Sequence, residues 1–171
     1  MAHAHAITGT STAWWDGMLH VYVSPLAWAG VVALAAFLAR GAHEESLIGS
    51  FAAALFAVLG GFAAFVVPAA PLAASGVALV AAAAALGMTP TRMSAGIAGA
   101  IAGFAIAMAA TEGEAFTVGM MAGLGLGVIV AGTLLTRIMH WLHALQPIAP
   151  RVIAAWAGAI SLLMLLLALR N

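Results

Sequence analysis

Cysteine and lysine are both missing from this chain of 171 residues, and formal charge is confined to five arginines and five acidic residues. Without cysteine, disulfides, thiolate metal sites and thiol catalysis are excluded, so imidazole, thioether, carboxylate and backbone groups are the available metal ligands. Five scattered basic residues give no surface that could hold a nucleic acid through its phosphates. We therefore expect no nucleic-acid partner.

Apolar residues take the place of the missing charge. The chain is 65% hydrophobic and 6% charged, and its mean hydropathy is +1.17. Soluble domains are nearer half apolar and a quarter charged. The composition predicts an integral membrane protein whose surroundings are the lipid bilayer.

Six apolar runs follow one another, each about as long as the roughly 20 residues that cross the hydrocarbon as a helix. They span residues 18–39, 47–67, 72–88, 93–110, 116–139 and 152–169. Short segments with turn residues and charge, such as RGAHEES and TPTR, separate them. We predict an all-α integral membrane protein, with a polar His-containing tail over residues 1–13 and a bundle of six transmembrane helices over 14–171.

The arginines predict the orientation of this bundle. With the N-terminus outside, four arginines fall in the cytoplasm and one outside: Arg40, Arg92, Arg137 and Arg151 against Arg170. Cytoplasmic loops of membrane proteins are enriched in basic residues. We therefore expect the N-terminus and the C-terminus both to lie outside a bacterial inner membrane. Residues 1–13 have neither a basic nor an apolar segment, so no signal peptide is expected in them.

An acid and a histidine stand at the head of the first run. Asp16 and His20 are four residues apart, so on a helix they share a face and could bind one divalent ion. Alternatively, Asp16 is an interfacial residue near a helix start and His20 bonds a neighbouring carbonyl. Since ionisable groups are costly in lipid, we expect both to face the bundle interior. Ser24 and Pro25 follow, where a missing backbone donor is expected to bend the helix.

Further candidate ligands lie at the same, outer side. Glu112 and Glu114 follow the fourth run, Met108 precedes Glu112 by one turn, and Met120 and Met121 open the fifth run. Imidazole, carboxylate and thioether together suit nickel, copper or zinc better than magnesium or calcium. The sequence thus predicts an outward-facing transition-metal site that includes Asp16, His20, Glu112 and Glu114.

The N-terminal sequence MAHAHA adds two imidazoles, His3 and His5, and short His-rich tracts are typical of metal binding. A free amine at Met1 would allow the square-planar geometry that copper(II) and nickel(II) accept, with His3 as third residue. A disordered tail or a tag remnant is an equally good interpretation. We include His3 and His5 as candidate capture ligands.

On the expected inner side, His43, Glu44 and Glu45 stand opposite His140 and His143. His140 and His143 are three residues apart, so they can face the same way on a helix. These residues could form a release site for an ion, but ordinary solvated loop polarity is the preferred interpretation.

Glycines recur at every fourth position in the fourth and fifth runs. They are Gly99 and Gly103 in the fourth, and Gly119, Gly123 and Gly127 in the fifth. Such stripes let helix backbones approach closely. We predict that the fourth and fifth helices pack against each other and so bring Glu112 and Glu114 close to Met120.

The layout resembles the HupE/UreJ family of small bacterial permeases, which are linked with nickel supply. The resemblance consists of the His-containing tail, GMLH entering the first helix, six Ala/Gly-rich spans, and a GE that leads into AFTVGMMAGLGLGVIVAGTLL. It implies that His20 matches the first family histidine and that Glu114, or Glu112 in a shifted register, matches the family acid. Leu26 and Ala27 stand where the family has Asp-His, and Thr111 is one of the residues at the histidine positions of the fourth span. The remaining ligands suit a softer ion such as copper.

The sequence therefore favours a permease that captures a transition-metal ion, nickel or copper, at the outer face and passes it inward. No enzyme motif is present, so we expect no catalytic activity, although a metal-dependent membrane enzyme remains a weaker hypothesis. The main alternative is a non-catalytic membrane subunit of a larger complex, which the missing family ligands and the Gly/Ala-rich helices favour. A permease is expected to occur alone or as a homo-oligomer, whereas a structural subunit is expected to co-purify with larger proteins.

Overall fold

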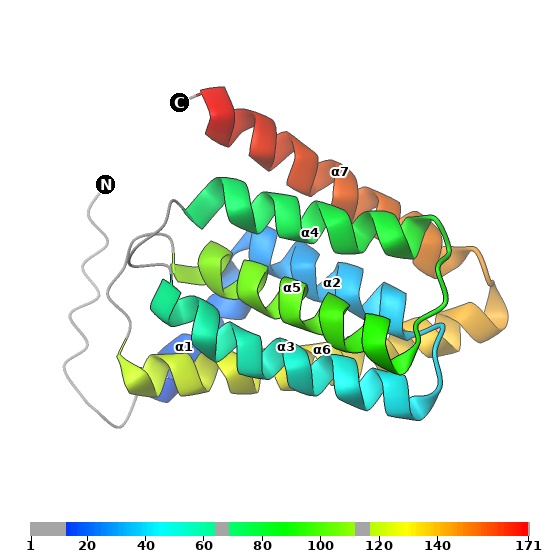
Figure 1. Cartoon of the computed structure of the whole chain (residues 1–171), viewed down its shortest axis with the longest axis horizontal. Helices are drawn as coiled ribbons and strands as arrows, with labels where there is room; N and C mark the ends of the chain where they lie inside the picture. The colour runs from blue at the N-terminus through cyan, green and yellow to red at the C-terminus, as the bar shows by residue number, and fades with distance from the viewer. Residues whose placement is uncertain (1–12, 64–68, 112–116, 171) are drawn as a thin grey trace.

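The computed structural model describes residues 13–63, 69–111 and 117–170, and these ranges contain seven α-helices and no strand (Figure 1). The helices are α1 (Ala13–Val23), α2 (Pro25–Leu38), α3 (His43–Ala63), α4 (Ala69–Ala85), α5 (Arg92–Thr111), α6 (Val118–Leu145) and α7 (Ala149–Arg170). Each of the six apolar runs coincides with one helix, except that the first is divided between α1 and α2.

Length and composition make this an all-α membrane protein. Four helices, α3, α5, α6 and α7, are each long and apolar enough to cross a membrane. The α1–α2 pair passes the same test as a unit but is bent by 78°. The remaining helix, α4, is apolar and has 17 residues.

The predicted bend occurs at Ser24. Pro25 has no N–H, so the carbonyl of Val21 loses its helical donor and the first helix cannot continue. Ser24 adopts an extended backbone with φ −83° and ψ 116°, and its Oγ accepts a hydrogen bond from the N–H of Ala27 as the N-cap of α2. The same hydroxyl donates to the carbonyl of Ala109 in α5 at 3.1 Å. One side chain therefore begins α2 and ties the break to a neighbouring helix.

Helix α2 is the centre of the bundle. It packs against α4, α5, α6 and α7, and buries eleven of its 14 residues. A helix that is apolar on all sides is typical either of a protein core or of a membrane span, and α2 is covered by protein on most sides. Its largest buried side chains include Leu34, Phe37 and Leu38, while many of the others are alanines, which allow the surrounding helices to approach.

The glycine stripes of α5 and α6 do pack closely, but not on each other as the sequence predicted. A Cβ on Gly123 of α6 would overlap the backbone carbonyl of Trp14 in α1. A Cβ on Gly103 of α5 would overlap the carbonyl of Ala53 in α3. The prediction was wrong because a small-residue stripe shows that a partner backbone comes close without identifying the partner, and here α1 and α3 each carry matching small residues such as Gly17 and Gly49.

Three connections, at residues 39–42, 86–91 and 146–148, lie together at one end of the bundle, which we call the basic end (Figure 1). Helix α4 terminates there in a Schellman motif, with Gly87 at φ +78° and with the N–H groups of Gly87 and Met88 donating to Ala84 and Ala83. The guanidinium of Arg151 donates to the carbonyl of Ala85 at 3.0 Å, where a helix C-terminus favours a positive charge.

Arg40 reinforces the same helix end by donating to the carbonyl of Met88 at 3.3 Å. Arg92 at the start of α5 forms an ion pair with Glu44 at the start of α3. Arg170 ends α7 at the opposite end, which we call the α1 end. The arginines are thus divided between the two ends as the sequence indicated.

The close approach of α1 and α6 predicts a contrast between two glycines of α6. Gly123→Ala should lower the free energy of unfolding by about 1–3 kcal/mol, because its Cβ overlaps the backbone of Trp14. Gly132→Ala should raise that free energy by about 0.5–1 kcal/mol, because open space surrounds Gly132 and alanine favours a helix. Thermal unfolding of both variants in detergent measures the difference, and equal melting temperatures would contradict the observed helix contact.

Candidate functional sites at the two ends of the bundle

The predicted ligands Asp16 and His20 lie on α1, and both are half-buried. The buried side of α1 is formed by Gly17 and Val21, so Asp16 and His20 lie beside that face rather than at its centre. Nδ1 of His20 lies 2.6 Å from the backbone carbonyl of Asp16. Because a carbonyl only accepts, Nδ1 carries the proton, and a metal ion would have to bind Nε2.

Two exposed tryptophans precede this pair. The rings of Trp14 and Trp15 have centroids 4.1 Å apart, and the side chains are 38% and 48% exposed. Amphipathic rings of this kind lie at membrane interfaces. Asp16 and His20 therefore directly follow two rings of the kind that membrane interfaces favour.

The methionines near this end separate into two places. Gly17 of α1 lies against the backbone of Met120, so the start of α6 is next to the Asp16 turn, as predicted. Met108 is fully buried and instead lines an apolar cavity of about 210 Å³ with residues of α2, α4 and α7, including Leu26 and Met164. The thioether of Met108 thus belongs to the bundle core.

The remaining sequence-predicted ligands, His3, His5, Glu112 and Glu114, lie outside the described residues. Within the described ranges, no three His, Asp or Glu side chains are placed together so that they could hold a metal ion.

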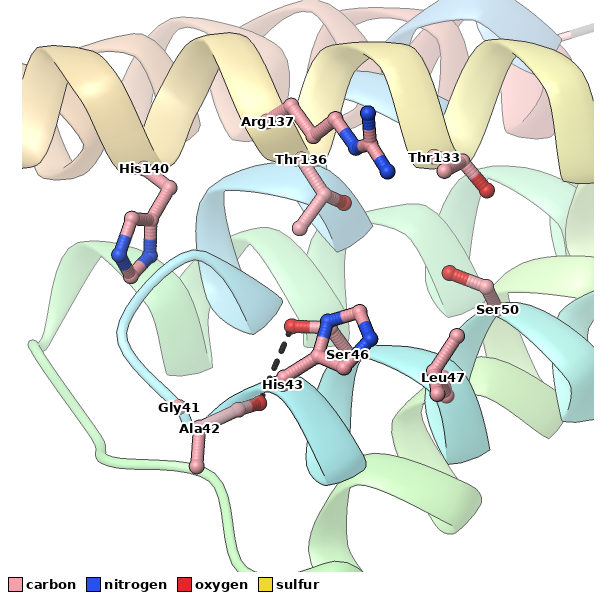
Figure 2. A pocket seen from close by; sticks show the side chains of 10 residues that line it. All are labelled: Gly41, Ala42, His43, Ser46, Leu47, Ser50, Thr133, Thr136, Arg137 and His140. Carbon is pink, nitrogen blue, oxygen red and sulfur yellow. Dashed lines mark hydrogen bonds between the residues drawn. The ribbon is translucent and has the colours of Figure 1, made fainter.

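A pocket of about 290 Å³ lies at the basic end, between the start of α3 and the second half of α6 (Figure 2). Seven of its ten lining residues have side chains with polar groups, and they are His43, Ser46, Ser50, Thr133, Thr136, Arg137 and His140. Thr133 and Thr136 project from α6 toward α3. His43 and His140, which the sequence analysis considered for one inner site, thus line the same pocket.

The hydroxyl groups of this pocket differ in their partners. Oγ of Ser46 donates to the carbonyls of Leu38 and Ala42 at 3.3 Å each. Thr136 is 7% exposed, and its Oγ1 is buried without a hydrogen-bond partner among the described residues. Buried hydroxyls are nearly always paired, so Thr136 has an unused capacity to bind.

The nitrogen-containing side chains of the pocket also differ in their partners. Nδ1 of His140 lies 3.0 Å from the carbonyl of Ala39, which leaves Nε2 as the nitrogen that could contact a ligand. Arg137 is exposed and has no hydrogen bond or ion pair to any part of the chain that the structure describes. Because its guanidinium is always charged, the pocket is a poorer site for a metal cation than the two histidines alone suggest.

The two acids expected near this site lie elsewhere. Glu44 pairs with Arg92, and neither Glu44 nor Glu45 lines the pocket. His143 is half-buried, with Nδ1 3.2 Å from the carbonyl of Pro147, and it does not line the pocket either. Of the five residues considered for an inner site, only His43 and His140 line the pocket.

Sequence reasoning missed the hydroxyls and Arg137. Their spacing carries a signal, since positions 133, 136, 137 and 140 recur at the interval of one helix face. Ser46 and Ser50 likewise stand four apart on α3. Two short polar stripes on otherwise apolar helices are therefore the pattern that indicates this pocket.

Comparison of the chain with models of protein families, with curated proteins and with solved structures gave no match.

The unpartnered hydroxyl predicts an unusual effect of substitution. Thr136→Val should raise the free energy of unfolding by about 1 kcal/mol or more, because it removes a buried donor without a partner and keeps the shape. Thr111→Val is the matched control: Thr111 is also buried on a helix, but its Oγ1 donates to the carbonyl of Ala107 at 3.0 Å. Thermal unfolding in phosphate-free detergent compares the two variants. A lower melting temperature for Thr136→Val than for Thr111→Val would show that Thr136 is already satisfied.

Proposed function

We propose that this chain is a six-span protein of the bacterial inner membrane, with both termini outside, that captures a transition-metal ion at its outer face and passes it inward. Nickel or copper is the ion that the donor types favour. Capture by His3 and His5 precedes coordination by Asp16, His20 and Glu112 or Glu114. The proposal includes no catalytic step.

The main support for this proposal is the break in the first apolar run between α1 and α2. Transporters commonly bind their substrates where a membrane helix is broken, because the break leaves backbone carbonyls available. Here the chain bends by 78° between α1 and α2, and His20 precedes the break by one turn. Pro25 deprives the carbonyl of the buried residue Val21, the next residue after His20, of its helical donor.

Asp16 supplies the negative charge that a divalent cation requires at this place. It lies one turn before His20 on the same helix, and both side chains are half-buried. Ionisable groups within membrane segments are costly and usually mark the path of an ion or substrate. The pairing of an acid and an imidazole with a broken helix therefore supports transport rather than a purely structural role.

Metal uptake into proteoliposomes tests the proposal. The parent protein should accumulate nickel or copper above protein-free vesicles, and His20→Ala should reduce the uptake rate by at least about tenfold, because a ligand is lost. His143→Ala is the control, since His143 lies at the basic end and outside both sites. Uptake equal to that of protein-free vesicles for nickel, copper, cobalt and zinc would remove the transport function. Stoichiometric co-purification with larger proteins in mild detergent would then favour a structural subunit.

The absence of cysteine allows a direct test of orientation. Val118→Cys lies at the α1 end with a 74% exposed side chain, and Gln146→Cys lies in a loop of the basic end. The outer membrane is removed from the cells while the inner membrane stays intact, and an impermeant maleimide is added. It should label Val118→Cys at once, and should label Gln146→Cys only after the inner membrane is permeabilised. The reverse pattern would place the termini in the cytoplasm.

A further inference from the structure

We propose that the pocket at the basic end binds a phosphoryl group, supplied by a phospholipid headgroup or by free phosphate. This inference is independent of the proposed metal transport, which places its ligands at the α1 end. The pocket is lined by one guanidinium, two imidazoles and four hydroxyl groups, and none of its ten lining residues is acidic. Arg137 carries a permanent positive charge, and because no carboxylate in the lining opposes it, the pocket favours an anion.

Arg137 supplies the permanent charge. Three other arginines at the basic end are already engaged: Arg40 with the Met88 carbonyl, Arg92 with Glu44, and Arg151 with the Ala85 carbonyl. Arg137 has no such partner within the described part of the chain. A planar guanidinium can donate two parallel hydrogen bonds to the oxygens of one phosphoryl group. Arg137 is thus the basic residue of this end that the fold leaves available.

The hydroxyls supply neutral donors deeper in the same pocket. Oγ1 of Thr136 is buried and unpartnered, and the side chain lies between Arg137 and the serines of α3 in Figure 2. Ser50 is 9% exposed and lies across the pocket on α3. A phosphoryl oxygen accepts several hydrogen bonds, so it could satisfy Thr136, which the protein itself does not.

The start of α3 adds a favourable field. Ala42 and His43, where α3 begins, line the pocket, so the positive end of the helix dipole lies there. The two acids of this turn lie outside the pocket lining, and Glu44 is paired with Arg92.

The position of the pocket fits a phosphate ligand in a membrane. Basic pockets between transmembrane helices on the cytoplasmic side bind lipid headgroups. This pocket lies between two spanning helices at the end that carries most of the arginines, and the exposed Leu47 forms part of its wall. A headgroup could enter from the bilayer, and a phosphate ion could enter from the water.

Two binding measurements on the purified full-length chain test the proposal and separate the two sources. Radiolabelled inorganic phosphate is measured by equilibrium binding in phosphate-free detergent. Phosphatidylglycerol is measured by native mass spectrometry, with diacylglycerol as the control that lacks the phosphoryl group. We expect at least one of the two phosphorylated probes to bind, and Arg137→Gln to weaken that binding by about tenfold or more, because a charge-assisted contact is lost.

Arg151→Gln is the matched control, because Arg151 is an arginine of the same end that lies outside the pocket and bonds a backbone carbonyl, so its loss frees no carboxylate. It should bind as the parent does. Thr136→Val should weaken binding several-fold while its melting temperature without ligand does not fall, a combination that general loss of structure would not give. If Arg137→Gln does not fold, Thr136→Val and Thr133→Val make the comparison.

Binding of phosphatidylglycerol alone would identify a lipid headgroup as the ligand, and binding of phosphate alone would identify a free anion. The proposal is wrong if neither probe binds the parent, if diacylglycerol binds as well as phosphatidylglycerol while phosphate does not bind, or if the pocket variants bind as tightly as Arg151→Gln. None of these outcomes depends on metal uptake, so failure of the transport function would leave this test unaffected.

Discussion

Within a bilayer, every backbone N–H and C=O group needs a partner inside the protein, and the arrangement of this bundle depends on how that constraint is met at Ser24. A straight first span would satisfy its backbone by itself. The proline at position 25 prevents this, so the chain turns, and the Ser24 hydroxyl both caps α2 and donates to the carbonyl of Ala109 in α5. The turn places α2 at the centre of the bundle and leaves α1 against α6.

Much of the fold could be predicted from the sequence because the hydrocarbon thickness imposes one length on every span. The apolar runs, the bend at Pro25 and the division of the arginines between two ends all follow from local residues and are present in the structure. Helix partners were not predictable in the same way. Gly103 and Gly123 require a nearby backbone, but the choice of α3 and α1 as partners depends on how all the helices pack together.

The same contrast between local sequence and helix packing applies to the two candidate sites. Asp16 and His20 are a local pair, and their spacing alone places them on one helix face, although the bond from His20 to the Asp16 carbonyl depends on the side-chain conformation. The pocket at the basic end joins residues about ninety positions apart in sequence. Neither polar stripe, on α3 or on α6, is notable until the two helices are placed beside each other.

The central position of α2 also has a consequence for biosynthesis. The helices that enclose α2 are mainly α4, α5, α6 and α7, and all of them follow it in the chain. During synthesis α2 therefore enters the membrane before its final neighbours exist. Its alanine-rich, uncharged surface is compatible with lipid in that interval. The helix therefore contacts lipid first and replaces these contacts with protein contacts as each later helix is inserted. Assembly of the centre is complete only when α7, the last helix, has been inserted.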